Sequence, residues 1–232
     1  MRASKIVAAL AAGLGVSAAP IAARAVISHD AVVGFAETVP SGTLGSAYLK
    51  FKPWLKVVNG CVPFPAVDTA GNTGGGLDIT GASNGDCDSS TGQVYVRSTA
   101  VGSSYAFMYS WYMPKDSPSS GLGHRHDWES IVVWTDTSYS TILGVATSAH
   151  GEYATTTSPP LDGTRAKIQY YSTWPTNHQL GTTDTKGGEQ PLIAWESMTD
   201  AARTVLTNTD FGSANVPFKD ANFQNNLALA AL

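Results

Sequence analysis

The residues of this sequence best suited to chemistry lie together in GLGHRHDWES, residues 121–130. Two histidines, an arginine and two carboxylates fall within six consecutive positions, although only 14% of the chain is charged. On a strand, Asp127 and Glu129 would point to one face and Trp128 to the other, toward the core. Neighbouring carboxylates repel each other unless a cation or a shared proton lies between them. The spacing therefore predicts a cation-facing pair beside a core tryptophan.

Two more side chains complete the predicted site. His124 follows Gly123, which lets the imidazole swing over the carboxylate face, and Asp116 lies in the preceding loop, which can fold back. Three carboxylates and one imidazole, without a thiolate, suit Mg²⁺, Ca²⁺ or Mn²⁺ better than Zn²⁺. The predicted metal ligands are Asp116, His124, Asp127 and Glu129.

Three other interpretations of the cluster stay open. One is a solvated salt-bridge network in which Arg125 pairs with Asp127 or Glu129. Another is a cupin-like metal enzyme, although its HxH motif needs three or four residues before the glutamate and only two separate His126 from Glu129. The last is a hydrolase with His126 as base and Ser130 or another serine as nucleophile, although the sequence contains no GxSxG motif.

The elements that position these residues are predicted to be mostly strands. The 23 glycines and 12 prolines favour short strands and turns. Strands are expected at 49–58, 93–101, 104–114, 127–136, 142–150, 167–172 and 191–197, and a helix at 199–207. The aromatic run 104–114 predicts a central strand buried on both faces, and 115–125 a long loop. These elements predict an all-β chain, a β-sandwich with long loops at one end and one or a few short helices.

The first 25 residues have the composition of a signal peptide. Arg2 and Lys5 precede an apolar run that ends in small residues, which predicts a signal peptide at 1–19 with cleavage as late as Ala25. A buried N-terminal helix is the alternative. With a signal peptide, residues 20–232 are predicted to be a single secreted domain. Cleavage after Ala25 would remove three of the 14 basic residues and none of the 18 acidic ones, which leaves a net charge near −7. Such a chain is not drawn to nucleic acid or anionic lipid by its overall field.

Cys61 and Cys87 are the two cysteines of the chain. In an oxidising compartment they are expected to form a disulfide that pins the polar, glycine-rich segment between them. Two free buried thiols are the alternative. A zinc site is disfavoured because no CxxC motif or nearby histidine accompanies either cysteine.

Residues 106–129, AFMYSWYMPKDSPSSGLGHRHDWE, closely resemble the signature of the necrosis- and ethylene-inducing peptide 1-like proteins, secreted cytolysins of plant-associated microbes. The heptapeptide GHRHDWE is present without a mismatch. HDAVVGF, the cysteine pair, WPTNH and FGSANVPFKDANF also resemble the family, so the similarity covers nearly the whole mature chain.

The resemblance implies a β-sandwich similar to actinoporins and fungal lectins, secreted into the plant apoplast and monomeric in solution. It implies binding to glycosylated inositol phosphoceramide headgroups of the plant plasma membrane, followed by bilayer damage, necrosis and defence responses without enzymatic chemistry. A divalent cation held by the four predicted ligands would bind the sugar. One alternative is a metal-dependent cell-wall enzyme, cupin-like or hydrolytic, that uses the same residues. The other is a non-cytolytic lectin, since some family members with an intact heptapeptide are not toxic.

The resemblance also assigns roles to single residues. Arg125 and His126 would support the metal site through hydrogen bonds or pairing. Trp174 and His178 match a loop that contacts sugar and membrane, although a core tryptophan beside a turn is the alternative for Trp174. Segment 106–129 resembles the pattern that plant immune receptors detect. Because it is mostly a buried strand, we expect it to be accessible only after degradation.

Overall fold

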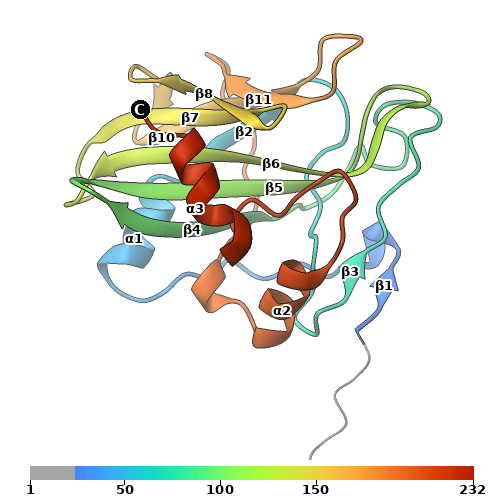
Figure 1. Cartoon of the computed structure of the whole chain (residues 1–232), viewed down its shortest axis with the longest axis horizontal. Coiled ribbons are helices and arrows are strands. Elements are labelled where there is room, and N and C mark those ends of the chain that lie inside the picture. The colour runs from blue at the N-terminus through green and yellow to red at the C-terminus, as the bar shows by residue number, and fades with distance from the viewer. Residues whose placement is uncertain (1–23) are drawn as a thin grey trace, which may run out of the picture.

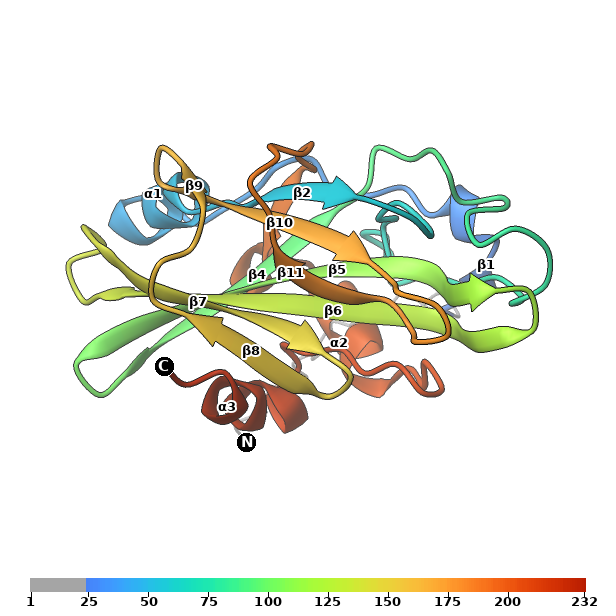
Figure 2. The ribbon, with the colours of Figure 1, turned by 90° about the horizontal axis from the view of Figure 1, so that it is seen from above.

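The computed structural model describes residues 24–232 as two β-sheets packed face to face, with a few short helices outside them (Figures 1 and 2). The predicted signal peptide, residues 1–19, lies outside the described residues. The larger sheet has six strands in the order β12-β4-β5-β6-β7-β8. Its strands are β4 (Val94–Val101), β5 (Ser104–Ser119), β6 (Leu122–Asp136), β7 (Ile142–Ala149), β8 (Glu152–Thr156) and β12 (Leu192–Ala194). This arrangement confirms the predicted all-β sandwich.

The second sheet is smaller and covers one face of the first. It has the order β11-β10-β2, and β9 pairs with β10. These strands are β2 (Trp54–Val57), β9 (Leu161–Asp162), β10 (Arg165–Tyr171) and β11 (Gln179–Thr182), and a separate parallel pair joins β1 (Val26–Ile27) to β3 (Thr73–Gly74). The alternating burial of β10 is that of a strand with one face on the core and one toward solvent.

In the described part of the chain three helices lie around the sheets: α1 (Thr43–Lys50), α2 (Asp200–Asn208) and α3 (Asp220–Leu229). The predicted helix at 199–207 is α2, which begins after Thr199, whose hydroxyl accepts the N–H of Ala202 as an N-cap. Two short 3₁₀ turns occupy His29–Ala31 and Trp195–Ser197. No helix within residues 24–232 is long and apolar enough to cross a membrane.

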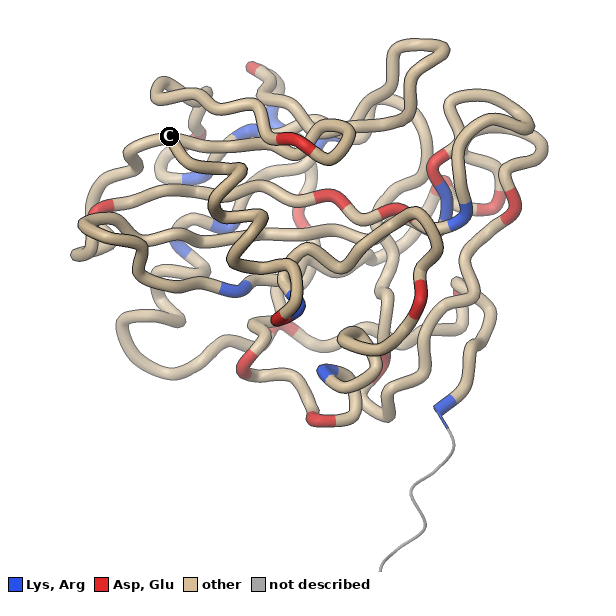
Figure 3. The backbone as a smooth tube through the Cα atoms, viewed as in Figure 1, with Lys and Arg blue, Asp and Glu red and all other residues tan. Residues whose placement is uncertain are grey.

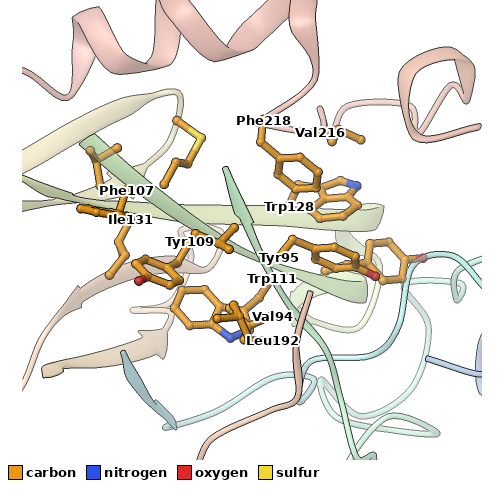
Figure 4. Packing of buried hydrophobic residues seen from close by; sticks show 14 of the residues in the cluster. Val94, Tyr95, Phe107, Tyr109, Trp111, Trp128, Ile131, Leu192, Val216 and Phe218 are labelled. Carbon is orange, nitrogen blue, oxygen red and sulfur yellow. The ribbon is translucent and has the colours of Figure 1, made fainter. Parts of the chain in front are cut away.

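The hydrophobic core fills both sides of the larger sheet, as expected for the run 104–114. On one face, Phe107 packs against Tyr48 and Phe51 from the α1 region, with ring centroids 5.8 and 5.5 Å apart. On the other, Trp128 lies 5.4 Å from Tyr95 and 5.6 Å from Phe218 (Figure 4). Trp128 is therefore the core anchor that strand alternation predicted.

The connection between the fifth and sixth strands differs from the prediction. Residues 115–125 were expected to be a long loop, but β5 continues to Ser119 and β6 begins at Leu122. Register pairing holds Asp116 opposite His124, so the turn is short and the strands extend well past the sheet centre. Pro118 and the two glycines fit here because the hairpin end is an irregular edge, where lost ladder bonds cost little.

The disulfide between Cys61 and Cys87 is present, as predicted. It closes the segment that carries β3 and the turns after it. Both sulfurs are buried in the core, which disposes of the free-thiol alternative.

Candidate cation site

Three of the four predicted ligands meet where the β5–β6 hairpin leaves the sheet. Asp116, His124 and Asp127 each offer one ligand atom, and these atoms all lie within 4.8 Å of one another. Glu129 lies outside this group but lines the same cavity. The structure thus gathers a carboxylate from β5 with an imidazole and a carboxylate from β6.

The backbone of β6 must break its alternation to bring these groups together. In a regular strand His124 and Asp127 would point to opposite faces, because they are three residues apart. His126 has a left-handed backbone with φ of 62°, which interrupts the alternation between them. Gly123, with φ of 103°, is also required, since a Cβ there would lie 2.0 Å from the Asp116 carbonyl oxygen. Reasoning from alternation alone could not place His124.

Asp116 is fixed by His178, which precedes β11. The His178 ring donates from Nδ1 to Asp116 Oδ1 at 2.6 Å, and its backbone N–H lies 3.1 Å from both carboxylate oxygens. The ring stacks on Tyr170, with centroids 4.7 Å apart. His178 is buried but also lines the cavity beside the cluster, so its sugar-contacting role stays a prediction. It holds Asp116 from behind, a role that sequence reasoning missed.

Asp127 is fixed from the second sheet. The Tyr170 hydroxyl donates to Asp127 Oδ2 at 2.7 Å. Burial raises the pKa of Asp127 well above its usual range, and the nearby Asp116 carboxylate raises it further. The Tyr170 hydrogen bond and the Trp128 backbone N–H partly oppose this rise. Burial and the neighbouring carboxylate therefore disfavour the ionised form of Asp127 when no cation is bound.

Glu129 is fixed from β7. The Ser148 hydroxyl donates to Glu129 Oε2, and Ser148 Oγ accepts the Ser130 backbone N–H at 2.9 Å. Burial raises the pKa of Glu129 well above its usual range, and Asp127 adds to the rise. Ser130 Oγ in turn lies 2.5 Å from the Tyr153 hydroxyl. Ser148, itself held by the Ser130 backbone, therefore fixes the Glu129 carboxylate at the cavity wall.

The residues present fit a divalent cation. The three carboxylates of Asp116, Asp127 and Glu129 are only 1%, 5% and 6% exposed, and within residues 24–232 none forms a salt bridge with a lysine or arginine. Figure 3 shows that acidic and basic positions are thinly spread along a backbone that is mostly uncharged. Buried carboxylates at such spacing demand a cation or shared protons. Oxygen donors with one imidazole suit Mg²⁺, Ca²⁺ or Mn²⁺.

Within residues 24–232 the side chains of Arg125 and His126, the two predicted support residues, form no ion pair or hydrogen bond with the three carboxylates. Arg125 forms its ion pair with Asp78, so the salt-bridge network with Asp127 or Glu129 is wrong. The His126 ring faces the opposite side of the sheet, 2.7 Å from the Tyr112 hydroxyl, and burial and the Arg125 charge lower its pKa to about 4.

The predicted hydrolytic pair is not assembled. Ser130 is bonded to Tyr153, whereas His126 lies among Tyr112 and Phe211. The two residues make no hydrogen bond with each other in the described part of the chain.

A cavity of about 430 Å³ opens beside the cluster. Its wall combines the acidic group with hydroxyl, amide and imidazole side chains, contributed by the β7–β8 turn and by residues 213–217. Trp174, in the β10–β11 turn, is 70% exposed, which rules out its alternative as a core residue. The polar lining has the donors and acceptors that a hydroxyl-rich ligand requires.

Comparison with known proteins identifies the relatives of this chain. Residues 45–230 match the family model described as "Necrosis inducing protein (NPP1)". NLP effector protein 10 of Phytophthora capsici is 54% identical over 215 residues, covering 89% of this chain and 92% of the relative. Necrosis-inducing protein NPP1 of Phytophthora nicotianae is 52% identical over 207 residues, covering 85% and 87%.

Solved structures also resemble it closely. "NLPPya in complex with mannosamine" has a TM-score of 0.86 and 51% identity, covering 89% of this chain and 99% of the other. "Crystal structure of non-toxic HaNLP3 protein" has a TM-score of 0.84 and 42% identity, covering 88% and 98%. One of these neighbours thus holds an amino sugar and the other is described as non-toxic.

Proposed function

Because this chain belongs to the family of necrosis-inducing proteins (NPP1), we propose that it is a secreted toxin and virulence factor that acts on plant cells by binding a membrane sugar through a divalent cation. Its ligand would be the headgroup of a glycosylated inositol phosphoceramide in the plant plasma membrane. The observation that carries the proposal is the group of buried carboxylates, without basic partners among the described residues, on the wall of a polar cavity.

Each side chain of the site has a binding role. A bound Mg²⁺, Ca²⁺ or Mn²⁺ would neutralise the carboxylates and offer coordination positions to sugar hydroxyls. Asp116, His124 and Asp127 would hold the ion, and Glu129 would join them from the cavity wall. His178, Tyr170 and Ser148 keep the three carboxylates oriented, so that little ordering remains when the ion binds.

Membrane damage would follow binding and involve no covalent step. The exposed Trp174 ring is suited to the interface between headgroups and acyl chains, because it is apolar with one polar N–H. We place the protein in the host apoplast, an expectation consistent with effector relatives. The net acidic charge favours attachment through the sugar over general attraction to anionic lipid.

A non-cytolytic lectin is the second candidate. It is favoured by the similarity to a structure described as non-toxic, which shares the fold at 42% identity. Such a lectin would bind the headgroup through the same residues and leave the bilayer intact.

An immune receptor is a further proposed partner. The segment 106–129 comprises most of β5 and the first half of β6, and its central part is buried on both faces. A receptor would therefore read it after proteolysis and not on the folded protein.

Dye release from phosphatidylcholine vesicles with and without the plant sphingolipid tests the proposal. We expect release only with the sphingolipid and a divalent cation, and loss of release in chelator. Asp127→Asn keeps the shape and an acceptor for Tyr170 but removes the charge, so it should abolish release. Asp184→Asn, at an exposed carboxylate, is the matched control and should behave as the unaltered protein.

The outcomes separate the candidates. Full release by Asp127→Asn would refute the cation-centred function. Cation-dependent vesicle binding without release would establish the lectin, and turnover of a soluble cell-wall glycan would establish the enzyme.

A further inference from the structure

A loop fastened to the end of the β5–β6 hairpin has no role in the function proposed above. Residues 75–82, named here the brace segment, lie beside the hairpin end, residues 114–125, in both Figure 1 and Figure 2. Two backbone hydrogen bonds join them directly. They are Leu77 N–H to the Pro114 carbonyl and Gly121 N–H to the Ile79 carbonyl, each 2.8 Å.

Side chains of the hairpin end add further contacts, the charged ones among them from two basic residues. Lys115, a buried lysine, donates from Nζ to the Ala82 carbonyl at 3.0 Å. Arg125 donates to the Gly75 carbonyl at 3.0 Å and forms an ion pair with Asp78. Both basic residues of the hairpin end thus bind the same segment. Their charges are directed away from the carboxylate cluster.

The brace segment is itself held in place. It lies between Cys61 and Cys87, whose disulfide closes the loop, and the Val62 N–H donates to the Cys87 carbonyl at 3.0 Å. Gly76 allows close contact, because a Cβ there would lie 2.7 Å from His126 Cε1. The segment therefore has a fixed base from which to hold the hairpin end.

His124 is the ligand that depends on this support. Asp116, Asp127 and Glu129 each accept a hydrogen bond from a side chain outside the hairpin. The His124 ring donates to the His126 carbonyl of its own strand at 2.7 Å and lies 3.7 Å from Asp116. In the described part of the chain no other loop or sheet bonds to the ring. Its position is set by the backbone next to Arg125.

We propose that the brace segment positions His124 in the cation site, and that Arg125 and Lys115 are the positioning residues through which it acts. This inference rests on the proposed function, because it concerns the cation affinity of the same site. It states that this affinity depends on a segment that is distant along the sequence but adjacent in space. It explains why two positive side chains lie next to ligands of a cation without binding the carboxylates themselves.

Because the positioning residues are positively charged, the proposal predicts the direction in which cation affinity changes when either one is removed. If Arg125 and Lys115 acted only through their charge, removing either one would lower the repulsion felt by a cation and raise its affinity. Positioning predicts the opposite. Loss of an orienting contact behind a metal ligand typically costs 10- to 100-fold in affinity, and we expect about tenfold here.

Titration calorimetry with Mn²⁺ alone shows whether the affinity of each variant falls or rises. Arg125→Met and Lys115→Met keep the apolar stems and should each bind Mn²⁺ about tenfold more weakly than the unaltered protein. Lys186→Met, which removes a half-exposed partner of Asp162 remote from the hairpin, is the control and should bind normally. Equal or tighter binding by both hairpin variants would overturn the proposal. Exchanging the charges, in Arg125→Asp with Asp78→Arg, should restore part of the affinity.

Hydrogen exchange of the cation-free protein gives a readout that does not depend on the ion. In Arg125→Met the amides of residues 117–125 should exchange faster, while those of β7 stay protected. Unchanged protection at the hairpin end would also overturn the proposal. If the unaltered protein binds no Mn²⁺ and the hairpin end of Arg125→Met still exchanges faster, the proposed function fails. The brace segment is then still shown to hold the hairpin end that carries His124.

Discussion

Removing the disulfide should destabilise the protein by an amount that follows from the length of the loop it closes. Cys61 and Cys87 are 26 residues apart, and closing a loop of this length in the unfolded chain corresponds to about 3.5 kcal/mol at 25 °C. For a domain of this size that loss lowers Tm by about 7 to 14 °C. The double variant Cys61→Ala with Cys87→Ala removes the link without leaving a lone thiol.

Urea unfolding followed by tryptophan fluorescence measures this free energy, and calorimetry measures Tm. Both sulfurs are buried, so substitution is a cleaner perturbation than a reductant, which would need the protein to open first. The slope of free energy against urea should rise, since the unlinked unfolded chain exposes more surface. A loss below about 1 kcal/mol with an unchanged slope would refute the loop-entropy reasoning.

Three further predictions concern the site and its surroundings. Ser148→Ala should lower the cation affinity about tenfold by calorimetry, because Glu129 loses its orienting hydroxyl; unchanged affinity would place Glu129 outside the coordination shell. Saturation with Mg²⁺ or Ca²⁺ at a hundred times Kd should stabilise the fold by about 2.7 kcal/mol, and a chelator should reverse the shift in Tm. Hydrogen bonds from the Ser140 side chain and backbone lower the pKa of Asp136 to about 2, so its contribution to stability is present above about pH 4 and is lost as the pH falls toward 2. An NMR titration that gives Asp136 an ordinary pKa would contradict this assignment.

Most of the fold was predictable because strand composition and burial agree along the chain. The aromatic run 104–114 and the strand at 127–136 form the middle of the larger sheet, and the capped helix at 199–207 is α2. The candidate strand at 49–58 is only partly right: α1 ends at Lys50, and β2 covers Trp54–Val57. Helix α3 was missed, since its apolar residues do not gather into one strong stripe.

The candidate site was predictable as a list of residues but not as an arrangement. Charge density and residue type identified Asp116, His124 and Asp127. The left-handed backbone at His126 that brings them together has no signature in single-residue spacing. The partners of Arg125 and His178 depend on segments more than forty residues away in the chain, which local patterns cannot reveal.

The site joins the two sheets of the sandwich. Tyr170 and His178 come from the smaller sheet and its edge, whereas Asp127 and Asp116 belong to the larger one. Sliding one sheet over the other would stretch both contacts and pull Asp116 and Asp127 away from His124, so the geometry of the site depends on how the layers are seated. Any movement between the layers would therefore reach the carboxylates through two hydrogen bonds, one to each aspartate.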